Sequence, residues 1–127
     1  MAKQTEAQRT TYTVFNKNRG WNISTRVSVA GTSQARRHGL LGKSSIDPET
    51  GLWIAPCEAI HTFGMKTVID VIFLDRHGRV RKLVTNLKPH RIAICLKAAS
   101  VLELASGKVM QSETTVGDQL QFHPSNE

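Results

Sequence analysis

The sequence predicts a mainly β fold at the α+β boundary, a compact antiparallel β-barrel or sandwich of seven to eight short strands with one or two short helices. Segments rich in β-branched and aromatic residues recur along the chain, and turn residues separate them. Their spacing leaves no room for strand–helix–strand units, which indicates mainly antiparallel pairing. A length of 127 residues suits one domain with a single core.

The first half of the chain predicts a hairpin, a short helix and a strand. YTVFN at 12–16 and the alternating WNISTRVSVA at 21–30 flank the turn signal NRG. Thr32 or Ser33 is expected to cap a helix of about two turns, which Gly39 ends. After the loop SSIDPETG at 44–51, a strand begins near Leu52 and stops at Pro56.

The second half predicts the strongest strand and several shorter elements. VIDVIFL at 68–74 is apolar on both faces, so we expect it at the centre of the sheet. DRHG at 75–78 fits a hairpin turn that Asp75 starts and Gly78 closes with a positive φ, and RVRKLV is the return strand. RIAICLKAASVLEL at 91–104 is interpreted as two strands joined near residues 97–100. ASGKVMQSE predicts a helical turn, and a turn at residues 117–118 precedes the last strand.

The chain is expected to form one β-rich domain at 10–123, with a mobile tail at 1–9 and a frayed end at 124–127. Its polar start and the lack of a long apolar stretch predict a cytoplasmic protein with no transmembrane segment. Cys57 and Cys95 lie far apart in no metal-binding pattern, so both are expected to be reduced thiols and no metal or cofactor is expected.

Positive charge is concentrated in two segments of the chain. The net charge is +7; residues 1–45 hold eight basic side chains and one acid, and residues 76–102 hold seven basic side chains and no acid. Such a surface suits an anionic ligand or an acidic protein. Nucleic acid is less favoured but not excluded, because no RNA-binding or zinc-finger signature accompanies the charge.

Several motifs resemble one known family. LWIAPCEAIHTFGMKTVIDVIFLDRHGRV, LKPHR, VLELASG and VGDQLQF are similar to segments of the domain-of-unknown-function 192 family of small bacterial and archaeal proteins, and RRHGLLGK resembles its R-x-x-GLLGR segment. Lys43 stands where that segment has arginine, which weakens a bidentate anion contact there. The resemblance implies a compact β-rich fold with small helical insertions, and it implies no activity.

Asp70 is the most unusual residue of the apolar run, because burying an ionised carboxylate without partners costs several kcal/mol. The favoured interpretation is a structural tie in which Asp70 accepts hydrogen bonds from main-chain amides of the loop at 61–65. Glu103, by contrast, is expected to face solvent. Phe63, Met65 and Trp53 could line a small apolar pocket, although ordinary core packing is the simpler expectation.

A catalytic interpretation of the same region makes Asp70 orient His61, with Cys57 or Thr62 as the nucleophile. It requires these side chains to converge on one cleft. A metal site built from His61, Asp70 and Glu58 is weaker still, because no spacing fixes those residues on one face.

The sequence therefore favours a small non-catalytic binding or accessory domain, and an enzyme is not the preferred hypothesis. The alternatives are a small hydrolase or transferase built on Cys57, His61 and Asp70, and a protein that binds nucleic acid or another polyanion. The predicted binding surface lies near His61 and extends over a basic face, with the residues His61, Thr62, Arg79, Arg81, Lys82, Lys88 and Arg91.

Overall fold

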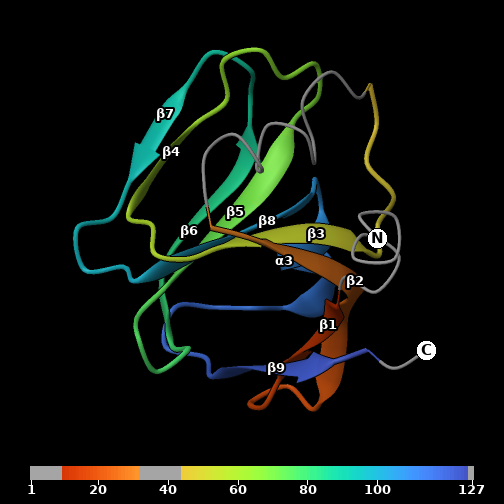
Figure 1. Cartoon of the computed structure of the whole chain (residues 1–127). Helices are drawn as coiled ribbons and strands as arrows, with labels where there is room; N and C mark the ends of the chain where they lie inside the picture. The colour runs from red at the N-terminus through yellow and green to blue at the C-terminus, as the bar shows by residue number, and fades with distance from the viewer. Residues whose placement is uncertain (1–9, 32–43, 126–127) are drawn as a thin grey trace, which may run out of the picture.

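A computed structural model describes residues 10–31 and 44–125 of the chain, and the regular secondary structure of these residues is almost entirely β (Figure 1). One short helix, α3, lies among the described strands. The elements are β1 (Thr11–Asn16), β2 (Trp21–Ala30), β3 (Thr50–Ile54), β4 (Ala59–His61), β5 (Ile69–Leu74), β6 (Val80–Leu87), β7 (Ile92–Ile94), β8 (Ser100–Ala105), α3 (Lys108–Ser112) and β9 (Leu120–Pro124).

Seven of the strands form one curled sheet, a half-barrel, in the order β6-β5-β8-β3-β2-β1-β9. Its two edge strands approach each other where Arg79 forms an isolated antiparallel bridge with Gln119. The remaining strands, β4 and β7, pair as a separate two-stranded ribbon at one side of the molecule (Figure 1). The predicted mainly antiparallel β fold is confirmed, with β2 and β3 as a parallel pair.

Turn chemistry explains the two hairpins that the sequence predicts. In the first, the side-chain oxygen of Asn16 accepts from the amides of Asn18 and Arg19, so the turn closes on its own residues. In the second, Asp75 accepts from the amides of His77 and Arg79. Gly78 has a φ of 82°, and a Cβ there would lie 2.8 Å from the Leu120 carbonyl oxygen, so both conformation and space require glycine.

Two apolar clusters lie on opposite faces of β5. Ile69, Val71 and Phe73 pack with Ile60 of the ribbon on one face. Ile72 and Leu74 belong to the second cluster, which also contains residues of β1, β2, β8, α3 and β9. Every residue of β5 is therefore buried. The prediction that β5 lies at the centre of the sheet is wrong, because β5 is the second strand from one edge. Its apolar character reflects the apolar clusters that cover both of its faces.

The shorter predicted elements of the C-terminal half are also present. β7 and β8 are separate strands joined across residues 95–99, and α3 is the predicted helical turn. The predicted helix after Thr32 and the tail at 1–9 lie outside the described residues. Pro124 belongs to β9, and the Ser125 amide donates to the Thr11 carbonyl, so the predicted fraying does not begin at residue 124.

Within the described ranges, none of the helical segments has the length and apolar character needed to cross a bilayer. The predicted cytoplasmic location stays a prediction.

Asp118 ties together the turns at the seam between β9 and the first hairpin. One carboxylate oxygen accepts from the Asn16 side chain and from the Thr115 amide, each at 3.0 Å, and Arg19 lies 3.5 Å away. Burial alone would raise the pKa of Asp118, but the hydrogen bonds from Asn16 and Thr115 and the charge of Arg19 outweigh it and hold the pKa below its ordinary value. The ionised carboxylate therefore stabilises the fold.

We expect Asp118→Asn to lower the free energy of unfolding by about 1–3 kcal/mol at neutral pH, because it replaces a charged acceptor of several hydrogen bonds. Since the pKa is lowered in the folded state, the contribution is complete above the ordinary aspartate range and is lost as pH falls through the folded pKa. Urea unfolding as a function of pH measures both effects. Glu113→Gln, at an exposed position, is the control, and equal losses in the two variants would contradict the assignment.

Candidate functional site

The Asp70 carboxylate is buried and fully engaged by main-chain donors. The residue is 1% exposed. Oδ1 accepts from the Asn86 amide at 3.0 Å, and Oδ2 accepts from the amides of Gly107 at 3.1 Å and Val109 at 2.9 Å. Charge-assisted bonds of this kind offset the cost of removing a carboxylate from water. Asp70 thus joins β5 to β6 and to the start of α3.

Local irregularities bring these donors to Asp70. The β5–β6 register shifts between Ile69 and Val71, and Asn86 of β6 has a positive φ of 54°, which directs its amide at the carboxylate. Gly107, with a φ of 96°, precedes α3, so Asp70 caps that helix from a distant strand. The prediction that the donors belong to the loop at 61–65 is therefore wrong.

Asp70 and His61 do not converge on one site. Strand alternation places Asp70 on the same face of β5 as Ile72 and Leu74, whereas the ribbon that carries His61 packs through Ile60 on the opposite face. The His61 ring nitrogen Nδ1 accepts from the Phe63 amide at 3.3 Å. Asp70 is therefore not placed to orient His61, as the hydrolase or transferase hypothesis requires.

Cys57 lies in the segment between β3 and β4. The Cys57 thiol donates to the Ala59 carbonyl at 3.1 Å. Among the described residues, no group of three His, Cys, Asp or Glu side chains could hold a metal ion.

Thr62 has a structural role in the described fold. Its buried hydroxyl donates to the Lys88 carbonyl at 2.7 Å and accepts from the Arg91 amide at 2.9 Å. It therefore anchors the loop that leads into β7, and it is not available at the surface.

The predicted basic residues remain near the surface, and most of them contact neighbouring segments. Arg79 donates to the Gly117 carbonyl, and Arg81 lies 3.9 Å from Asp75. The Lys82 ammonium donates to the Ile94 carbonyl at 2.7 Å, which links β6 to the ribbon. Lys88 and Arg91 are exposed on the loop before β7.

The outward face of the ribbon and the residues that follow its strands form a candidate for binding, which we call the ribbon patch: His61, Phe63, Ile92, Ile94 and Leu96. Phe63 is 49% exposed, Ile92 62%, Ile94 47% and Leu96 77%. The Phe63 ring stacks on His61 at 5.1 Å between centroids, with the His90 ring at 6.3 Å. The inward residues Ile60 and Ala93 belong to the core, so the ribbon is apolar on both faces.

Sequence reasoning missed two burial states. Phe63, expected in the core, is exposed, whereas Met65 is a core residue as expected. Glu103, expected to face solvent, is 1% exposed, because β8 places it on the same face as Val101 and Ala105. The available signal was the uniform apolar character of VLELA, which is typical of a strand covered on both faces.

The family resemblance is decided by comparison of the whole chain with known families. The profile of domain of unknown function 192 (DUF192), described as uncharacterized ACR, matches residues 14–122. The chain belongs to this family. The resemblance stated from the motifs is therefore confirmed. Curated protein sequences contain no match to this DUF192 chain.

Two solved structures share the fold of this DUF192 chain. A candidate transcription regulator from Sinorhizobium meliloti 1021 is 22% identical, with a TM-score of 0.76 over 89% of this chain and 92% of its own. A protein of unknown function from Novosphingobium aromaticivorans DSM 12444 is 21% identical, with a TM-score of 0.73 over 87% of this chain and 82% of its own. Identities this low support the fold alone.

We expect Asp70→Asn to lower the free energy of unfolding by about 1–3 kcal/mol, because an amide side chain cannot accept at both of its ends and one main-chain donor loses its partner. Urea unfolding of the purified variant measures the loss. Asp47→Asn is the matched control, since Asp47 pairs with Arg26 at an exposed position and such pairs contribute little. A loss for Asp70→Asn no larger than that of the control would contradict the structural tie.

Proposed function

We propose that this DUF192 chain is a non-catalytic binding domain whose ribbon patch docks onto an acidic protein segment that carries apolar side chains. The observation that supports it is the exposure of Phe63, Ile92, Ile94 and Leu96 on a ribbon whose opposite face is already buried. Apolar side chains clustered in this way on a solvent-exposed surface are typical of interaction sites.

The ribbon patch differs from isolated exposed apolar residues in its arrangement. Ile92 and Ile94 are two positions apart on β7, so both side chains leave the same face. His61 pairs directly with Ile92 across the ribbon, and Phe63 stacks on His61. A partner would cover these groups together.

Charge defines the chemistry of the partner. The chain from residue 76 to residue 102 carries seven basic side chains and no acid, and it includes β7 and the loops on both sides. Arg91 directly precedes Ile92, Lys88 lies earlier in the same loop, and Lys97 directly follows Leu96; all three are exposed. Glu58, directly before β4, is exposed as well, so the surroundings of the ribbon are predominantly but not uniformly basic. An excess of one charge around an apolar centre steers an oppositely charged partner.

Nucleic acid is the second candidate, because the stacked Phe63 is a platform on which a base could lie. The aliphatic side chains of Ile92, Ile94 and Leu96 favour a protein partner, since they offer no hydrogen bond or stacking surface to a nucleotide. A role in transcription belongs to the description of the Sinorhizobium protein and adds no weight at 22% identity.

A labelled synthetic peptide in which Asp alternates with Leu tests the proposal by fluorescence anisotropy. We expect saturable binding, and we expect Ile92→Ser combined with Ile94→Ser to weaken it about tenfold, because two apolar contacts are lost. Met110→Ser combined with Val116→Ser is the matched control, since these residues are 82% and 61% exposed outside the ribbon patch.

The control variant should bind as tightly as the unmodified protein, and a peptide with Lys in place of Asp should not bind. Equal weakening by both double variants, or no saturable binding of the acidic peptide, would contradict the proposal. Tighter binding of a single-stranded oligonucleotide, with affinity that falls steeply with salt, would transfer the assignment to nucleic acid.

A further inference from the structure

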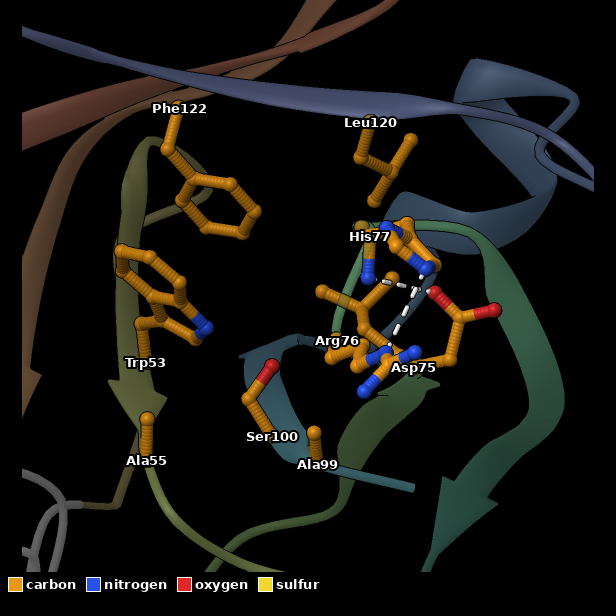
Figure 2. Close-up of a pocket in the computed structure, with 11 residues that line it drawn as sticks. Trp53, Ala55, Asp75, Arg76, His77, Ala99, Ser100, Leu120 and Phe122 are labelled. Carbon is orange, nitrogen blue, oxygen red and sulfur yellow. Dashed lines mark hydrogen bonds between the residues drawn. The ribbon is translucent and has the colours of Figure 1, made fainter. Parts of the chain in front are cut away.

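A pocket of about 420 Å³ opens at the end of the half-barrel, away from the residues of the ribbon patch. Figure 2 shows it between Trp53 and Phe122 on one side and the β5–β6 turn on the other. Its volume lies within the range of small-molecule sites. The lining residues are Trp53, Ala55, Leu74, Asp75, Arg76, His77, Gly78, Ala99, Ser100, Leu120 and Phe122.

The Trp53 indole supplies an unused hydrogen-bond donor at this pocket. Its ring stacks on Phe122 with centroids 3.8 Å apart, and Tyr12 packs edge-on at 5.9 Å, so the ring is fixed. Its Nε1 is buried and has no hydrogen-bond partner in the described part of the chain. The nitrogen points toward the space between Trp53 and the β5–β6 turn (Figure 2). By comparison, the Trp21 indole donates to the Ser112 carbonyl.

The opposite wall of the pocket carries one cation, Arg76, and one acid, Asp75. Arg76 is exposed, and its Nε donates to the His77 ring at 3.3 Å, which orients a guanidinium group that carries five donors in total. The acid in this wall, Asp75, already accepts from two main-chain amides and lies near Arg81. Burial would raise the pKa of Asp75, but the amides of Arg79 and His77 and the nearby charges hold it below its ordinary value. The charge of Asp75 is therefore engaged by the amides of its own turn and by Arg81.

We propose that this pocket binds a small monocarboxylic acid with an apolar, preferably aromatic, body. One carboxylate oxygen would accept from the Trp53 indole N–H, and the planar guanidinium of Arg76 would supply the counter-charge. The Ser100 hydroxyl lies in the same lining as a further polar group. Leu74, Ala99, Leu120 and Phe122 would enclose the body of the ligand.

The composition of the lining selects a carboxylate over other charged groups. A phosphate dianion needs more donors than one indole and one guanidinium, and the remaining walls are mostly apolar. A cationic ligand would face Arg76, while Asp75 is already engaged by its own turn. A pure hydrocarbon is a poor ligand as well, because it would leave the buried indole N–H without an acceptor.

Fluorescence of Trp53 tests the proposal directly, because the chain has two tryptophans and Trp21→Phe leaves Trp53 as the single reporter. Phenylacetate is the probe. Phenylacetamide keeps the ring without the charge, hexanoate keeps the charge without the ring, and phenyl phosphate carries the larger anion. We expect phenylacetate to change the Trp53 emission saturably, and we expect binding of each of the other three compounds to be weaker, about tenfold weaker for phenylacetamide.

Two variants test whether the ligand binds in this pocket. Arg76→Gln should weaken phenylacetate binding about tenfold, whereas Lys17→Gln, an exposed change of equal charge outside the lining, should leave it unchanged. Trp53→Phe keeps a ring but removes the N–H, and calorimetry should show weaker binding in a folded variant. Equal binding to the Arg76 and Lys17 variants, no saturable response to phenylacetate, or equal affinity for phenylacetamide would overturn the proposal. The ribbon patch is unaffected by either result.

Discussion

The buried carboxylate of Asp70 is the constraint on which the arrangement of the C-terminal half depends. It lies within a fully buried strand, and three main-chain amides from two other elements converge on it. Those amides belong to a bulge in β6 and to the start of α3, where the first amides of a helix have no partner within the helix. The charge therefore fixes irregular backbone where apolar packing alone would not choose one conformation.

The local parts of this fold were predictable from the sequence, and the long-range parts were not. Asn16 and Asp75 set their turns through amides two to four residues away, so short patterns contain the whole interaction. Asp70 finds its donors 16 to 39 residues away, across a bulge and a helix start that no local pattern specifies. The sequence correctly indicates that the acid must be satisfied, but it does not identify the donors.

The same difference applies to the candidate sites. The charge of Arg79, Arg81 and Lys82 is visible in the sequence, whereas the exposure of Phe63 and Ile92 is not, because apolar residues in strands are usually core. Trp53 stands in a strand with both neighbours buried, and only the curl of the sheet brings it opposite Arg76. Both proposed sites thus lie where the fold departs from the simple rule of apolar inside and polar outside.

Amide hydrogen exchange followed by NMR tests the role of Asp70 most directly. Asn86 and Gly107 are exposed residues, so their amides would exchange rapidly if the surrounding backbone were ordinary loop. If the carboxylate holds them, the amides of Asn86, Gly107 and Val109 should exchange as slowly as those of β5 and β8. Exchange of these three amides at the rate of an open loop would contradict the account.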